Sequence, residues 1–140
     1  MYETPQLAEA AFYDAFQRAD FEAMSDVWAK DDEVLCIHPM GPRLQGHDAV
    51  LASWGEIFSG GATLRFTISD AIYNSDGKVS VHHVFENISY GENFDQHSVV
   101  IATNIYRLTG DGWRMYAHHG SPGRAPVVSV SPASESETMH

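Results

Sequence analysis

The 140-residue sequence is poor in cysteine and in lysine. Its one cysteine, Cys36, leaves no disulfide to form within the chain, which favours a reducing compartment. Lys30 and Lys78 are the only lysines, and 8 basic residues stand against 19 acidic ones, a formal net charge of −11. A surface of that sign repels other polyanions, so we expect neither nucleic acid nor a membrane as a partner.

Long apolar runs are also missing. No stretch approaches the roughly 20 apolar residues that a membrane-spanning helix needs. Met1–Pro5 has neither the positive charge nor the apolar stretch of a signal peptide, so we expect a cytoplasmic protein. Cys36 lies in the apolar run Val34–Ile37, whose neighbours supply no positive charge to activate a thiolate, and this indicates a buried structural residue.

What the sequence does have is enough apolar material for one core. Apolar residues make up 44% of the chain, with 7 Phe, 6 Tyr and 3 Trp. We predict one domain over residues 1–124 and a mobile C-terminal tail over residues 125–140, because Ser131–His140 is small and polar. Val127, Val128 and Val130 either add an edge strand, pack on a partner subunit, or form a loose end.

The first 60 residues have helical periodicity. Thr4 with Pro5 predicts the start of one helix, whose apolar stripe runs from Leu7 to Phe16 and leaves Glu9, among others, to solvent. Asp20 caps a second helix, and a third begins near Asp48 and ends at Ser59–Gly61. Between the last two helices, residues 34–37 read as a short buried strand and residues 38–46 as a loop.

The period then changes to that of strands. Four candidates are separated by strong turn signals, and they cover residues 64–73, 78–90, 96–108 and 113–119. Strands joined by short turns form an antiparallel meander. Helices followed by strands therefore predict an α+β domain, with the helices packed on one face of a curved, mainly antiparallel sheet.

This order of elements, together with several motifs, resembles the SnoaL-like branch of the NTF2-like superfamily. The resemblance covers roughly residues 5–122, and the segments that carry it are Val34–Pro39, Gly46–Trp54, Val84–Ile88, Ala102–Tyr106 and Gly112–Pro122. It implies a cone-shaped barrel with an internal pocket, and a homodimer formed through the outer face of the sheet. It implies no single activity, because relatives with this fold are isomerases, dehydratases, hydrolases, cyclases or proteins that only bind or assemble.

Glu86 is the first candidate catalytic residue. It interrupts the apolar strand Val84–Ile88 and shares a strand face with His82. If that face lines the cone, burial raises the pKa of the carboxyl, which can then exchange protons near neutral pH. The alternative is an outward face, or a structural pair with a His or Arg.

The paired histidines each offer one side chain to a common site, because adjacent strand residues point to opposite faces. His119 shares its face with Trp113 and Met115, the more apolar set, so we predict His119 in the pocket and place His118 at a dimer interface. The alternative for His119 is a structural core or interface histidine.

Two further polar residues are candidates. His38 ends a short strand and either orients a substrate, pairs with a carboxylate, or holds its loop through a backbone hydrogen bond. Asn104 lies within an apolar strand and hydrogen-bonds either a ligand or a neighbouring side chain. Ligand-binding apolar walls are predicted from the large aromatic residues Trp28, Trp54, Phe58, Phe85 and Tyr106, and the alternative is that most of them simply belong to the core.

No cofactor is expected. The sequence has no glycine-rich phosphate loop and no Ser or Cys nucleophile motif. A metal site of His38, His82 or His83, His119 and Glu86 is an alternative, but no HxH or HExxH spacing supports it, so we expect no metal.

Three functions are consistent with these features. The first is a dimeric small-molecule pocket protein that carries out acid–base chemistry on a compact, partly apolar substrate, with Glu86, His119 and His38 as catalytic residues and Asn104 binding the ligand. The others are a ligand-binding module without turnover and a dimeric assembly module. The absence of a complete catalytic set favours the second.

Overall fold

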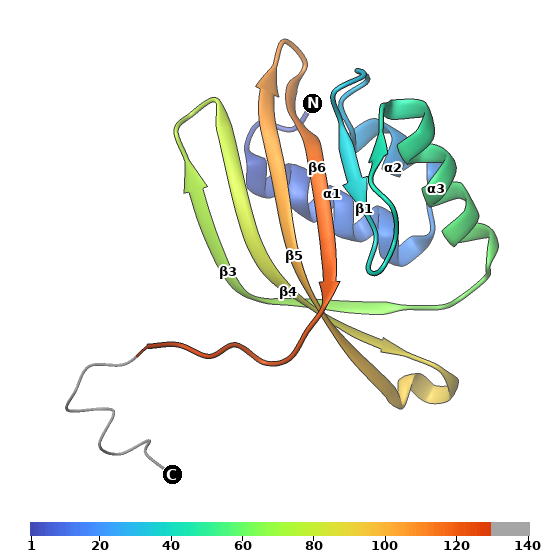
Figure 1. Cartoon of the computed structure of the whole chain (residues 1–140). Coiled ribbons are helices and arrows are strands. Elements are labelled where there is room, and N and C mark those ends of the chain that lie inside the picture. The colour runs from blue at the N-terminus through green and yellow to red at the C-terminus, as the bar shows by residue number, and fades with distance from the viewer. Residues whose placement is uncertain (130–140) are drawn as a thin grey trace.

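The computed structural model describes residues 1–129, in which the helices precede most of the sheet (Figure 1). Helices α1 and α2 are followed by two short strands, helix α3 and four long strands. Their bounds are α1 Pro5–Arg18, α2 Phe21–Val27, β1 Leu35–Ile37, β2 Leu44–Gln45, α3 His47–Ser59, β3 Arg65–Ser75, β4 Val79–Tyr90, the 3₁₀ helix η1 Glu92–Phe94, β5 Gln96–Thr109 and β6 Gly112–Pro122.

Short polar side chains begin the first two helices, as predicted. The Thr4 side chain accepts a hydrogen bond from the Leu7 amide, with Pro5 in the first helical position, and the Asp20 side chain accepts one from the Ala23 amide. The third helix, α3, begins at His47 with Asp48 in its first turn, where a carboxylate interacts favourably with the helix dipole.

The six strands form one sheet in the order β2-β1-β6-β5-β4-β3. The antiparallel meander predicted for the four long strands is present, and β1 joins its edge by parallel pairing with β6. One prediction needs correction here, because residues 38–46 are not wholly a loop: Leu44–Gln45 turns back to pair with β1.

The sheet curls around the helices, which pack against one face of it (Figure 1). Two register shifts interrupt the long strands, one between Ser69 and Ile72 in β3 and one opposite Ile105 and Tyr106, in β6. Such bulges bend a strand and increase its twist. The face toward the helices is the inner face, and its residues alternate with those of the solvent-facing outer face.

Buried and partly buried aromatic side chains from the helices fill the space above the inner face. Phe12 of α1 packs edge-on against Trp54 of α3 at 5.5 Å between ring centroids, and Phe16 contacts both Trp54 and Phe66 of β3. Cys36 is buried, as predicted, and its pKa is raised to about 12 by burial. It therefore remains a thiol at neutral pH.

Residues 125–129 belong to no helix or strand, so Val127 and Val128 do not extend the sheet. Val130 and the predicted mobile segment Ser131–His140 lie outside the described residues. Within residues 1–129, no helix combines the length and the apolar character needed to cross a membrane.

Candidate functional site

Glu86 lies on the inner face of β4 and is 2% exposed. Residues 80, 82, 84 and 86 are all buried, which is the alternation of a strand with one face against the core. The Tyr13 hydroxyl of α1 donates a hydrogen bond of 2.6 Å to Glu86 Oε2. Among residues 1–129 no Lys, Arg or His pairs with this carboxyl, and its Oε1 has no hydrogen bond.

Tyr13 links Glu86 to a buried chain of hydrogen bonds. Asn104 Nδ2 donates to the Tyr13 hydroxyl oxygen at 3.0 Å, and Asn104 Oδ1 lies 2.6 Å from His118 Nδ1. Because an amide oxygen only accepts, His118 must donate from Nδ1 and its Nε2 carries a lone pair. We call Glu86, Tyr13, Asn104 and His118 the buried chain; all its hydrogen bonds point toward the Glu86 carboxylate.

Burial shifts the pKa values of Glu86 and His118, the two ends of the buried chain, in opposite directions. It raises the pKa of Glu86 to about 7, and the hydrogen bond from Tyr13 offsets a smaller part of that rise. It lowers the pKa of His118 to about 3, with smaller contributions from His38 and His119. At neutral pH the imidazole is therefore uncharged, and the carboxyl is divided between its two protonation states.

The prediction that His119 enters the pocket is wrong, and so is the placement of His118 at an interface. Ile105 and Tyr106 are consecutive in β5, but their partners in β6, Ala117 and Met115, are two residues apart. Tyr116 is therefore an extra residue in β6, a β-bulge. This bulge reverses the alternation after Met115: His118 becomes buried and His119 is exposed. The His119 side chain therefore points to solvent, on the face opposite the buried His118.

His38 lies at the end of β1, half-buried, with its ring centroid 6.5 Å from that of His118. Its Nε2 is 2.9 Å from Ser53 Oγ, and the Ser53 hydroxyl donates to the Val50 carbonyl at 2.6 Å. The Ser53 hydroxyl has one proton, which it donates to the Val50 carbonyl, so its oxygen accepts the hydrogen bond from His38 Nε2. In a neutral His38 the proton is then on Nε2, and Nδ1 carries the lone pair. Burial lowers the pKa of His38, which favours this neutral form.

A second buried network lies beside the first, and sequence reasoning missed it. Glu9, assigned to solvent, is 7% exposed, and its Oε1 lies 3.1 Å from His82 Nδ1. His82 Nε2 lies 2.8 Å from Ser80 Oγ. Serine, histidine and carboxylate thus follow one another as in a hydrolytic triad, with Ser80 fully buried.

Both networks depend on α1, which contributes Glu9 and Tyr13 four residues apart on one side of the helix. The helix is rotated from the predicted stripe, so that Leu7 is exposed and Glu9 faces the sheet. One signal for Tyr13 was present in the sequence, because it lies next to Phe12 in the middle of the buried stripe.

A cleft between α1 and β3 gives access to this region. It has a volume of about 380 Å³ and includes Glu9, Tyr13 and Tyr73, together with the bulge at Asp70. Asp70 has a left-handed backbone (φ 51°), which a non-glycine residue adopts at some cost in free energy. The cleft exposes one edge of Tyr13, the residue that holds Glu86.

Of the predicted apolar wall, Trp54 and Tyr106 lie in the interior beside the two networks, where their rings contact His118 and His82 respectively. Phe85 is on the outer face, because it alternates with buried Val84 and Glu86. Trp28 is fully buried but lines a different cleft, below the α2–β1 connection. These two residues are therefore not part of a wall around Glu86.

The side chains of the alternative metal site are not brought together either. His83 and His119 are exposed, whereas Glu86 is buried on the inner face. Over the described range 1–129, no three His, Cys, Asp or Glu side chains are grouped so as to hold a metal ion.

Comparisons with known proteins agree with this architecture. A family model described as SnoaL-like domain matches residues 8–125. A crystal structure from Thiobacillus denitrificans, named as a candidate calcium/calmodulin-dependent protein kinase type II association domain, is 36% identical, with a TM-score of 0.82 over 89% of this chain and 98% of the other. The chain matches none of the curated proteins searched.

Two further structures name possible activities for their own proteins. A candidate dehydratase of the NTF2-like family from Streptomyces avermitilis is 33% identical, with a TM-score of 0.76 over 86% of this chain and 94% of that one. A ketosteroid isomerase-like protein from Erwinia carotovora atroseptica is 15% identical, with a TM-score of 0.68 over 86% and 94%, and so shows the fold alone. The family and the α+β fold predicted from the sequence motifs are thereby confirmed.

Proposed function

Because the chain belongs to the SnoaL-like domain family of the NTF2-like superfamily, we propose that it binds a compact, partly apolar organic molecule and transfers a proton on it without a cofactor. Glu86 is the acid–base residue of this proposal. The observation that carries it is a carboxyl that is buried, has no cationic partner and has a pKa raised to about 7. Such a group is both available as a base and ready to return its proton at neutral pH.

The other members of the buried chain act by position. Tyr13 stabilises the Glu86 anion through a 2.6 Å hydrogen bond, and Asn104 and His118 orient the Tyr13 hydroxyl. His38 offers the Nδ1 lone pair near His118, where it can accept a hydrogen bond from a substrate hydroxyl. Aromatic rings from α1, α3 and β3 supply the apolar surroundings.

The reaction class follows from this chemistry. The Glu86 carboxylate takes a proton from a carbon next to a substrate carbonyl, leaving an enolate. In a β,γ-unsaturated substrate, return of the proton to the γ-carbon completes an isomerisation. In a β-hydroxy substrate, departure of the hydroxyl with that proton, as water, completes a dehydration. The names of two relatives, a candidate dehydratase and a ketosteroid isomerase-like protein, support both outcomes.

Exchange of carbon-bound protons for deuterium tests this proposal. We expect the protein in D₂O to accelerate exchange next to the carbonyl of benzylacetone, or loss of water from its β-hydroxy derivative. Glu86→Gln should slow that reaction by about 10²–10⁴-fold, the usual contribution of a general acid–base residue. The reaction is followed by proton NMR.

Glu56→Gln is the matched control, because Glu56 is an exposed residue of α3. It should leave the rate unchanged. An equal rate in folded Glu86→Gln would remove Glu86 from the mechanism. Probe binding without exchange in the unsubstituted protein would favour a binding module without turnover.

Assembly through the outer sheet face is a second candidate. Ile72 and Ile101 expose 60% and 41% of their surfaces there, and apolar side chains gathered on one exposed face favour a protein–protein contact. The relative from Thiobacillus denitrificans, named as a candidate association domain, supports the same interpretation. We propose that the chain forms a homodimer through this face.

Substitution of Ile101 by aspartate tests the dimer. A buried, unpaired carboxylate is costly, so we expect Ile101→Asp to shift the native mass spectrum from dimer to monomer. Ile57→Asp, on α3 away from the sheet, is the control and should remain dimeric. If the unsubstituted protein is a monomer at micromolar concentration, the interface is absent.

A further inference from the structure

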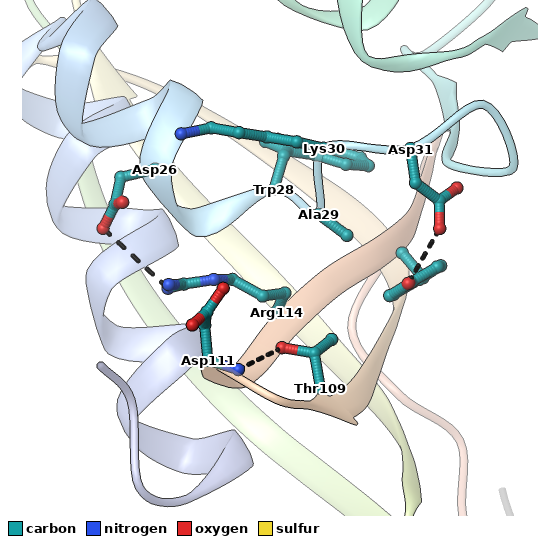
Figure 2. Close-up of a pocket in the computed structure, with 9 residues that line it drawn as sticks. Asp26, Trp28, Ala29, Lys30, Asp31, Thr109, Asp111 and Arg114 are labelled. Carbon is teal, nitrogen blue, oxygen red and sulfur yellow. Dashed lines mark hydrogen bonds and ion pairs between the residues drawn. The ribbon is translucent and has the colours of Figure 1, made fainter.

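A second, polar cleft lies between the α2–β1 connection and the β5–β6 turn (Figure 2). Its volume is about 300 Å³, the lower end of the range for small-molecule sites. Figure 2 shows Lys30 extending above Trp28 on one side, with Arg114 and Asp111 across from them. None of its lining residues belongs to the buried chain.

Two of the three carboxylates around the cleft already have partners. Asp31 accepts hydrogen bonds from the Tyr116 hydroxyl at 2.9 Å and from the Glu33 amide at 2.6 Å. Asp26 accepts one from the Tyr2 hydroxyl at 3.2 Å and lies 3.9 Å from Arg114 Nη1. These contacts hold the Asp26 and Asp31 side chains at the walls of the cleft.

The donors of the cleft are not matched in this way. Trp28 Nε1 and Arg114 Nη1 are two of only four buried side-chain nitrogen or oxygen atoms without a hydrogen-bond partner in the described part of the chain. Trp28 has no exposed surface at all. A buried N–H without a hydrogen bond costs about 1–3 kcal/mol, and Asp26 faces Arg114 Nη1 only as an ion-pair partner at 3.9 Å, so these two donors favour a further acceptor in the cleft.

The charges that remain free have opposite signs. Lys30 and Asp111 are exposed, and within residues 1–129 neither side chain forms a hydrogen bond or an ion pair. The cleft therefore combines a free cation, Lys30, and two donors without a hydrogen bond, on Arg114 and Trp28, with one carboxylate that has no partner, Asp111. A carboxylate ligand would match the donors, and an ammonium group on the same molecule would match Asp111.

We propose that this cleft binds a small amino-carboxylate, such as a free amino acid. Its carboxylate lies at Arg114, Lys30 and the Trp28 indole N–H, and its ammonium group at Asp111. A simple anion fits less well because Asp26, Asp31 and Asp111 repel it, and a simple amine leaves the donors unmatched. This site is independent of the acid–base function proposed for Glu86.

Three probes that differ in their charged groups distinguish these possibilities: L-alanine, propionate, which lacks the ammonium group, and ethylamine, which lacks the carboxylate. The readout is the indole N–H signal of Trp28 in a nitrogen–proton correlation spectrum, identified by its loss in Trp28→Phe. We expect L-alanine to shift this signal at millimolar concentration, with an affinity at least tenfold above those of propionate and ethylamine.

Variants of the free charges complete the test. Asp111→Asn should bring the affinity for L-alanine down to that for propionate, and Lys30→Gln should weaken both. Asp95→Asn, an exposed aspartate in another turn, should change neither. An unmoved Trp28 signal with all three probes would overturn the site, and equal affinities for L-alanine and propionate would overturn the amino-carboxylate.

Discussion

Glu86→Gln is expected to make the protein more stable above pH 7 and no more stable at pH 4.5. The pKa of Glu86 rises from 4.5 in the unfolded chain to about 7 in the folded one. Between these values the folded protein holds a proton that the unfolded chain has lost, so stability falls as pH rises. A shift of that size corresponds to about 3 kcal/mol, and glutamine, which does not ionise, removes this loss.

Urea unfolding at pH 4.5, 6 and 8 measures this effect as a difference between the variant and the unsubstituted protein. The glutamine carbonyl can still accept the hydrogen bond from Tyr13, so the comparison isolates ionisation. Glu56→Gln should give a difference near zero at every pH. A Glu86→Gln difference that is constant with pH would show that the carboxyl is not desolvated, and would also remove the main support for its acid–base role.

His118→Asn is expected to remove the contribution of His118 to the pH dependence of stability, which lowers stability in acid. The pKa of His118 is about 3 in the folded protein, against 6.5 unfolded. Between these values only the unfolded chain binds the proton, so the folded protein loses stability as pH falls, by about 5 kcal/mol over the whole interval. Asparagine places an amide N–H close to the former Nδ1 and does not titrate.

The variant should be less stable at pH 7, because it leaves a cavity where the ring packs against Phe12 and Trp54. The diagnostic result is therefore the slope: the stability difference from the unsubstituted protein should shrink steadily from pH 6.5 toward pH 3. His119→Asn, one residue away and exposed, is the control and should show no such slope. Parallel profiles for both histidine variants would contradict burial of an uncharged His118.

These two residues oppose each other in the unsubstituted protein. Between pH 4.5 and 6.5, stability falls with pH because of Glu86 and rises with pH because of His118, at nearly the same slope. Their contributions to the pH dependence of stability therefore nearly cancel in this interval. Substitution of either residue leaves the contribution of the other to be measured. The hydrogen-bonded chain through Tyr13 and Asn104 thus holds a titrating acid and an uncharged imidazole within one core.

Local features of the sequence determined the order and type of the elements. Thr4 and Asp20 cap α1 and α2 through hydrogen bonds to nearby backbone amides, so these helix starts depend on local sequence alone. The glycine-rich turns between strands are local signals in the same way. The five motifs that resemble the SnoaL-like branch were sufficient for the family and fold. Strand alternation also placed Glu86 with His82, because no bulge interrupts β4 between them.

The tertiary structure alone decided which other side chains join Glu86. Tyr13 and Glu9 reach the sheet because α1 packs with a rotation that its own periodicity did not specify. The choice of His118 over His119 depends on the extra residue at Tyr116, and Trp28 and Phe85 were likewise assigned to the wrong surroundings. A bulge arises from pairing with strands distant in sequence, so counting along one strand cannot find it.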